Sequence, residues 1–219
     1  MTGTGAFRRI GPVVESPNLG YNLIMHQSGG QSALSVRTGN SGVEVMVGFE
    51  EHERWMREAL TEATHALAAG DVPVGAVAVR DDRVVGRGHN RKEATCDPTA
   101  HAEIQALQEA ARTLGGWRLP GVTLYCTLEP CPMCAGAMIH ARLSRLVYAV
   151  DDPKTGAAGS VVDLLQHEQL NHRVEVIKGI LSEEVQALLQ TFFEGLRDGS
   201  IPRISAAWHR QRLASGKSS

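Results

Sequence analysis

The sequence lacks any apolar run approaching the ~18 residues that a membrane-spanning helix needs, which excludes a transmembrane protein. It contains four cysteines in 219 residues, too few for a disulfide-dense miniprotein. It also lacks an excess of positive charge: the net charge of -2 excludes a generally basic nucleic-acid coat. What is present is an apolar fraction of 42%, which fits a globular chain with a buried core and excludes a wholly disordered one.

The two ends of the chain differ in composition from its middle. Residues 1–48 show no sustained periodicity and are rich in Gly, Ser, Asn and Gln, so we expect a disordered extension there, with a short targeting arm as the alternative. No apolar core follows Arg8 and Arg9, which argues against a signal peptide. Met46, just before the first helical pattern, is a second candidate for the start of the functional chain. Residues 199–219 carry four basic residues and no acid, which predicts a basic, flexible tail.

Residues 49–198 alternate between helical and strand patterns. A helical face begins at Glu51 and ends at Gly70, and Asp81-Asp82 fits a tight turn between two strands. Ser182 is the expected N-cap of the last helix. The expected strands are 74–80, 83–88, 122–127, 146–150 and 174–178, and the other helices 99–114, 132–142 and 182–197. This order predicts an α/β protein, a three-layer α/β/α sandwich around one mixed sheet.

The first chemically distinctive cluster is Glu129-Pro-Cys-Pro-Met-Cys134, at the end of a strand and the start of a helix. Cys131 and Cys134 are three residues apart, so their sulfurs share one helical face. The positive end of a helix lowers the pKa of a thiol, which favours thiolates that bind a metal. Half of a structural four-cysteine zinc site and a redox pair are the alternatives for this motif alone. Cys96 and Cys126 do not have the spacing of a second metal-binding pair, and we expect both to be free thiols.

The second cluster, His101-Ala-Glu103, makes the metal interpretation specific. One histidine and two cysteines leave a fourth tetrahedral position for water, which is the pattern of a catalytic zinc site. Glu103, two residues after the histidine, is then the candidate proton carrier. An ordinary carboxylate in the first turn of a helix is the alternative for Glu103. The two clusters together predict metal-assisted hydrolysis, with His101, Cys131 and Cys134 as ligands of one Zn²⁺ per subunit.

His-x-Glu followed by Pro-Cys-x-x-Cys is the signature of zinc-dependent nucleobase deaminases. The longer strings resemble the bacterial tRNA-specific adenosine deaminases, a family of the cytidine deaminase-like fold. The resemblance covers residues 51–197 and rests on Asp71–Gly75, Asn90-Arg91, Asp97–Ile104, Thr127–His140, Lys154–Ser160 and Asn171–Glu175. One departure is that Phe192-Phe193 is not followed by the family's run of Arg and Lys, and the basic tail with Trp208 is a candidate replacement.

The resemblance implies hydrolytic deamination of the wobble adenosine, position 34, to inosine in the anticodon loop of tRNA-Arg. It also implies a homodimer. The two cysteines needed as metal thiolates favour a reducing cytoplasm, where tRNA also occurs, and no membrane partner is expected. Asn90 is implied to contact the flipped-out nucleoside, and the Asp152–Lys154 loop and Asn171 to contact neighbouring nucleotides. Two other functions stay open: a guanine or cytosine deaminase with the same zinc site, and a non-catalytic binding module stabilised by zinc.

Overall fold

The computed structural model describes residues 14–15, 21–28, 31–38, 44–47 and 49–201, within two compact units that divide between Glu53 and Arg54. In the first unit, β1 (Val14–Glu15), β2 (Tyr21–Ser28), β3 (Gln31–Thr38) and β4 (Glu44–Val47) form an antiparallel sheet in sequence order. The second unit contains five helices and five strands among its described residues, α1 beginning shortly before the division.

The first sheet stands where the sequence analysis expects disorder. Leu23 pairs with Val36, which pairs with Val45, so aliphatic residues form a row across three strands. Along each of these strands, apolar and polar residues alternate over only a few positions. The sequence therefore shows no sustained period-two pattern there. Met46, the candidate start, lies within β4.

The second unit is built on a mixed sheet of five strands. These are β5 (Gly75–Arg80), β6 (Arg83–His89), β7 (Thr123–Leu128), β8 (Arg145–Val150) and β9 (Glu175–Lys178), in the order β6-β5-β7-β8-β9. β5 is antiparallel to both of its neighbours, whereas β7, β8 and β9 are parallel. Asp81 and Asp82 join β5 to β6 with positive φ angles of 51° and 56°, as the tight turn requires.

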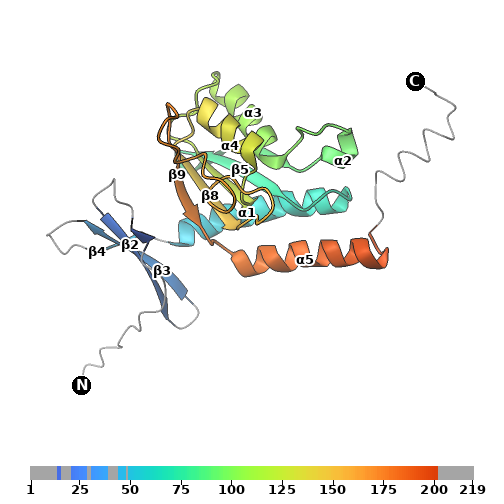
Figure 1. Ribbon diagram of the computed structural model, residues 1–219, viewed down its shortest axis with the longest axis horizontal. Coiled ribbons are helices and arrows are strands. Elements are labelled where there is room, and N and C mark those ends of the chain that lie inside the picture. Colours follow the sequence, from blue (N-terminus) through green and yellow to red (C-terminus); the bar gives the residue numbers. More distant parts are fainter. Residues whose placement is uncertain (1–13, 16–20, 29–30, 39–43, 48, 202–219) are drawn as a thin grey trace. The chain divides into compact units, whose positions relative to one another are not determined.

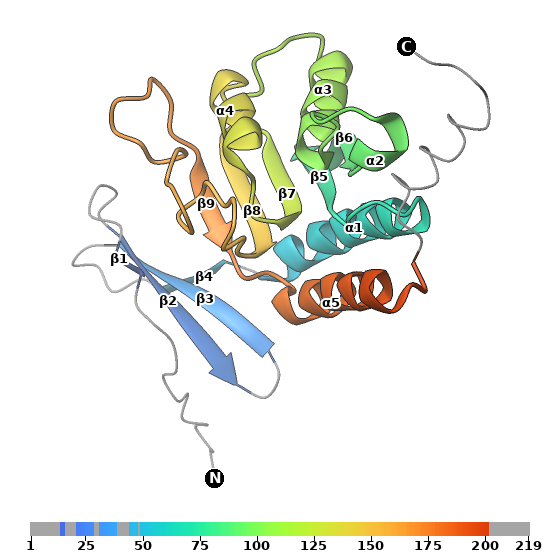
Figure 2. The same ribbon diagram turned by 45° about the vertical axis from the view of Figure 1, so that its right-hand side comes forward.

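Helices cover both faces of this sheet, which confirms the expected three-layer α/β/α arrangement (Figure 1). Figure 2 shows α3 (Ala102–Leu114) and α4 (Pro132–His140) on one face, and α1 (Phe49–Ala68) and α5 (Ser182–Asp198) on the other. A short helix, α2 (Lys92–Thr95), follows β6 and is absent from the sequence prediction. The predicted N-cap at Ser182 is wrong: Ser182 is the first helical residue, and Leu181, with φ 55°, precedes it.

The core is made of small residues where helices meet strands. One apolar cluster joins the α3/α4 face of the sheet to both helices; it includes Ala76, Ala78, Leu124, Ala106, Ala110 and Met138. Glycines allow the closest approaches, since a Cβ at Gly75 would lie 2.1 Å from the Ala59 carbonyl oxygen of α1. A Cβ at Gly88 would lie 2.2 Å from the Ala102 carbonyl oxygen of α3. The position of α3 is thus fixed directly by the β6 backbone.

No helix in the described part of the chain is long and apolar enough to span a bilayer. The expected basic tail lies outside the described residues from position 202 onward.

Candidate active site

His101 and Glu103 lie at the start of α3. His101 is the N-cap residue, with extended backbone angles, and Glu103 is in the first turn. The preceding turn is built by Asp97, whose carboxylate accepts hydrogen bonds from the Thr99 backbone N–H at 2.8 Å and the Thr99 hydroxyl at 2.7 Å. This turn explains why α3 begins at Ala102 and not at Thr99, as the sequence predicts.

Cys131 and Cys134 lie at the start of α4. Cys131 is the N-cap, Pro132 occupies the first helical position, and Cys134 is buried in the first turn. Proline suits this position because its missing N–H would have no intrahelical partner. α3 and α4 both begin at the same end of the strands. The last residues of β7 lie beside the first residues of β5, which in turn pair with the last residues of β6. The two clusters, 30 residues apart, therefore meet.

The three candidate ligand atoms form a nearly equilateral triangle. His101 Nδ1 lies 3.8 Å from Cys131 Sγ and 3.6 Å from Cys134 Sγ, and the two sulfurs are 3.7 Å apart. Tetrahedral zinc with Zn–S bonds of ~2.3 Å and Zn–N bonds of ~2.05 Å sets these edges at about 3.6 Å for S···N and about 3.8 Å for S···S. The residues therefore fit a tetrahedral metal ion, with the fourth position left to a non-protein ligand.

The thiols are unequal without a metal. A hydrogen bond with Cys134 lowers the pKa of Cys131 to about 4, against the effect of partial burial. The same hydrogen bond, together with burial, raises the pKa of Cys134. The hydrogen bond with Cys131 also raises the pKa of His101. The pKa of Cys131 and that of Cys134 thus move in opposite directions because the two sulfurs and the imidazole are so close together.

Glu103 is an unusual carboxylate because its side chain is buried, with an exposed fraction of 4%. Burial raises its pKa, while the charge of His101 opposes this shift. A buried carboxyl with a raised pKa is a candidate for accepting and releasing a proton during a reaction. Its place beside the three ligand residues is where such a group could act on a water molecule.

Asn90 follows β6 and is buried, with an exposed fraction of 6%. Its amide Nδ2 donates a hydrogen bond to the Asp71 carboxylate at 3.3 Å, which orients the side chain. Asp71 also accepts hydrogen bonds from the backbone N–H groups of Glu93 and Ala94, and so caps α2. The neighbouring Arg91 N–H donates to the Ala100 carbonyl at 3.0 Å, which ties this segment to the residue before His101.

Glu129 is a residue to which the sequence analysis assigns no role. Its buried carboxylate accepts hydrogen bonds from the backbone N–H groups of Asp152 at 2.8 Å, Ala158 at 2.9 Å and Ser160 at 3.1 Å. It therefore holds the 152–160 loop against the segment that leads into Cys131. The signal was available, since a carboxylate stands directly after a buried strand within the Glu-Pro-Cys string.

The two less specific candidates have local partners. Asp152 accepts hydrogen bonds from the Lys154 backbone N–H at 2.9 Å and the Thr155 hydroxyl at 2.6 Å. Asn171 accepts hydrogen bonds from the Arg142 guanidinium through both its side-chain and backbone oxygens, at 2.7 and 3.2 Å. Both side chains thus shape the loops that carry them, which is the ordinary alternative for each.

The four cysteines are free thiols, as expected for Cys96 and Cys126. Cys126 is buried in the core, and burial raises its pKa well above the ordinary value. Cys96 is exposed.

Comparison with known proteins agrees with the arrangement of sheet and helices, which is the cytidine deaminase-like fold. The family model of MafB19-like deaminases matches residues 50–197. A tRNA-specific adenosine deaminase of Bacillus subtilis is 46% identical over 147 residues, covering 67% of this chain and 91% of the relative. The chain therefore belongs to the deaminase family that contains the bacterial tRNA-specific adenosine deaminases.

Solved structures give the same result. A structure from a study of A-to-I editing by tRNA:A34 deaminases at the wobble position superposes with a TM-score of 0.60. It is 44% identical and covers 62% of this chain and 98% of its own. A guanine deaminase from Nitrosomonas europaea has a TM-score of 0.54 and 27% identity, covering 64% of this chain and 83% of its own.

Proposed function

We propose that the protein converts the wobble adenosine, position 34, of a tRNA anticodon loop to inosine by hydrolytic deamination, with tRNA-Arg as substrate. The observation that carries the proposal is the convergence of His101, Cys131 and Cys134 on one point beside the buried Glu103. The identity of 44–46% with proteins named for this activity supports adenosine in tRNA as the substrate.

Zn²⁺, one ion per subunit, is the cofactor that this donor set favours. One imidazole and two thiolates are ligands typical of zinc, and three protein ligands leave a position for water. When bound, zinc supplies a Lewis acid that lowers the pKa of its water toward neutrality. The chain's own contribution is to hold the three ligands rigidly, on the first turns of two helices that pack against one sheet.

Glu103 moves the protons. Its carboxylate accepts a proton from the attacking water and delivers it to the purine ring nitrogen next to the reacting carbon. It then passes the second water proton to the departing amine, so that water and adenosine give inosine and ammonia. Burial keeps bulk water from competing for these protons, and the raised pKa matches the task of accepting and then releasing a proton.

We assign the substrate contacts to loops at the end of the strands where α3 and α4 begin. We assign Asn90 to the flipped-out nucleoside, because its side chain is buried, held in one orientation by Asp71 and joined to the segment before His101. The 152–154 loop and Asn171 are the candidate contacts to neighbouring nucleotides. The proposal includes a homodimer and a cytoplasmic location, where tRNA occurs and thiolate ligands stay reduced.

The decisive assay compares substrates directly. The purified protein is incubated with an anticodon stem-loop that carries the wobble adenosine, and separately with guanine and cytosine, and products are identified by mass spectrometry. Inosine in the stem-loop supports the proposal. Ammonia from free guanine alone would replace it with the guanine deaminase alternative, which the structural similarity to the Nitrosomonas europaea enzyme favours as the second candidate.

Two variants test the mechanism within this assay. Glu103→Ala should retain zinc and lose turnover. Glu109→Ala removes an exposed carboxylate from the same helix and should remain active. If Glu103→Ala deaminates the stem-loop at the wild-type rate, the proton carrier is another group.

A further inference from the structure

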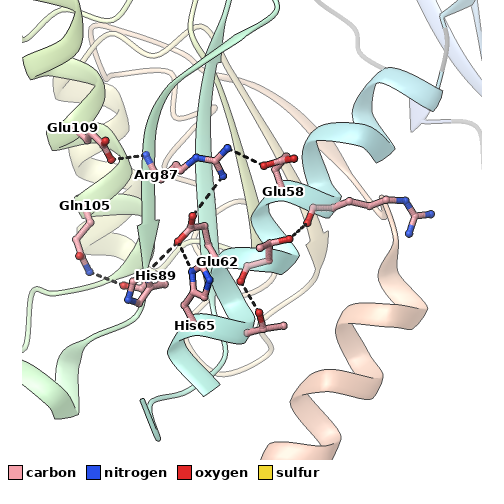
Figure 3. Close-up of polar contacts among 10 residues, drawn as sticks. Glu58, Glu62, His65, Arg87, His89, Gln105 and Glu109 are labelled. Carbon is pink, nitrogen blue, oxygen red and sulfur yellow. Dashed lines mark hydrogen bonds and ion pairs between the residues drawn. The ribbon is translucent and has the colours of Figure 1, made fainter. Parts of the chain in front are cut away.

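A second group of ligand atoms lies between α1 and β6, separate from the candidate active site. Glu62 and His65 are three residues apart on α1, and His89 is the last residue of β6. Figure 3 shows both imidazole rings directed at one carboxylate. The ligand atoms of the three residues all lie within 4.8 Å of one another.

The geometry is convergent. Glu62 Oε2 lies 3.3 Å from His65 Nδ1 and 3.2 Å from His89 Nδ1. Three nitrogen and oxygen ligands at ~2.05 Å from a tetrahedral zinc-like ion would be separated by about 3.3 Å. The observed spacings therefore match two edges of a metal coordination tetrahedron. They also match two hydrogen bonds, which is the alternative for the same atoms.

The carboxylate is held in place before any cation binds. Its second oxygen, Oε1, lies 3.5 Å from the Arg87 guanidinium, so Oε2 is the oxygen turned to the histidines. The Glu62 side chain is only 9% exposed, whereas His89 and His65 are 28% and 56% exposed. The site thus has a rigid buried ligand at its base and an opening to solvent at His65, through which a cation can enter.

The local charge favours a cation. Arg87 is paired with Glu58 at 2.8 Å as well as with Glu62, and its backbone N–H donates to the Glu109 carboxylate at 2.8 Å. Three carboxylates therefore surround Arg87, and with neutral imidazoles the cluster has an excess of negative charge. A bound divalent cation would neutralise this excess.

We propose that Glu62, His65 and His89 form a second metal site, which takes a divalent transition-metal cation of the zinc class. Two imidazole nitrogens and one carboxylate oxygen are typical ligands of such ions and poor ligands for Mg²⁺ or Ca²⁺. The ion would link α1 to β6, which is an edge strand of the sheet formed by the described residues. Its role is therefore structural, and it is independent of the reaction assigned to the other site.

The visible spectrum of bound Co²⁺ distinguishes the two sites, because the His-Cys-Cys site has thiolate ligands and the two-histidine, one-carboxylate site has none. Wild-type protein that carries one equivalent of zinc per chain is titrated with Co²⁺, and bound metal is counted by elemental analysis after dialysis. We expect a second equivalent of metal per chain whose visible spectrum lacks thiolate-to-cobalt charge transfer. We also expect the unfolding temperature to rise by about 5–10 °C at a metal concentration about 100-fold above Kd.

The variants assign that second equivalent to residues. His65→Gln and His89→Gln should each lose it and lose the thermal shift, while keeping the zinc of the His-Cys-Cys site. His167→Gln, which changes an exposed histidine outside the cluster, should keep both. A single equivalent in the wild type, or a second equivalent that survives in both His65→Gln and His89→Gln, would overturn the proposal. Because His65 is exposed, loss of binding in that variant cannot be attributed to misfolding if its circular dichroism is unchanged.

Discussion

Gly88 controls the position of the end of α3 that carries His101 and Glu103, and substituting it by alanine gives a sharp test of the candidate active site. The added Cβ would lie 2.2 Å from the Ala102 carbonyl oxygen and 2.7 Å from the Ala106 amide nitrogen. Relief to a contact of about 3.2 Å requires the first turn of α3 to retreat by about 1 Å. Metal–ligand distances tolerate only about 0.2 Å, so His101 would no longer reach the same ion as Cys131 and Cys134.

The expected result is a loss of zinc affinity of about 10- to 100-fold, with a destabilisation of about 1–3 kcal/mol from overpacking. Zinc content is measured by competition with a chromophoric chelator, stability by denaturant unfolding, and activity by inosine formation in the stem-loop. Loss of activity should follow loss of zinc and should be partly restored by excess zinc.

Two glycines provide matched controls. At Gly86 a Cβ would approach the Ala106 carbonyl oxygen equally closely, at 2.2 Å, but about 6 Å further along α3. Gly86→Ala should therefore destabilise the fold similarly and weaken zinc binding less. Gly136 on α4 has open space around its Cβ position, so Gly136→Ala should be neutral or stabilising by up to about 1 kcal/mol. If Gly88→Ala binds zinc like the wild type while Gly86→Ala does not, the reasoning about α3 is refuted.

Three further predictions concern other parts of the chain. Because burial raises the pKa of Glu103, its ionised form destabilises the folded metal-free protein, and stability falls as pH rises through that pKa. Glu103→Gln should therefore unfold at a higher temperature than the wild type at pH 8, and calorimetry at lower pH should show the difference shrinking; a growing difference would contradict it. Glu129→Gln removes the charge that binds three backbone N–H groups and should cost about 2–3 kcal/mol, with KM for the stem-loop raised more than zinc binding is lowered. Unchanged KM would mean that the 152–160 loop does not touch RNA. Deleting residues 199–219 should weaken stem-loop binding and reduce its salt dependence, and an unaltered salt titration would show that the tail takes no part.

The second unit was predictable because its local signals agree with its tertiary structure. The Asp81-Asp82 turn, the apolar strands and the helix-ending Gly70 each match an observed boundary to within a few residues. The clusters around His101 and Cys131 were recognisable because ligand identity and spacing are written in adjacent residues. The chemistry of the ligands indicates that the two clusters lie close together. Their geometry depends on β5, β6 and β7, which bring the first turns of α3 and α4 to the same end of the strands.

The features that sequence reasoning missed are held by long-range contacts. α2 has four residues, too few to give a periodic pattern, and is stabilised by the Asp71 carboxylate from 22 positions earlier. Glu129 acts on backbone groups 23 to 31 residues away, so the local sequence marks a carboxylate after a buried strand but does not show which groups it binds. The alternation in β2, β3 and β4 is distributed over three short strands and becomes regular only when their register is known.

The way Glu129 holds its loop has a consequence for how specificity could change. The carboxylate binds only main-chain amides, which every amino acid except proline provides. Side chains such as Lys154 could therefore be exchanged without altering the path of the loop. The exceptions are Gly156, where a Cβ would lie 2.2 Å from a carboxylate oxygen of Glu129, Gly159, whose φ is 126°, and the hydrogen-bonded pair Asp152 and Thr155. If the loop contacts RNA as proposed, randomising it with positions 152, 155, 156 and 159 kept fixed should change the nucleic-acid target without changing the path of the backbone.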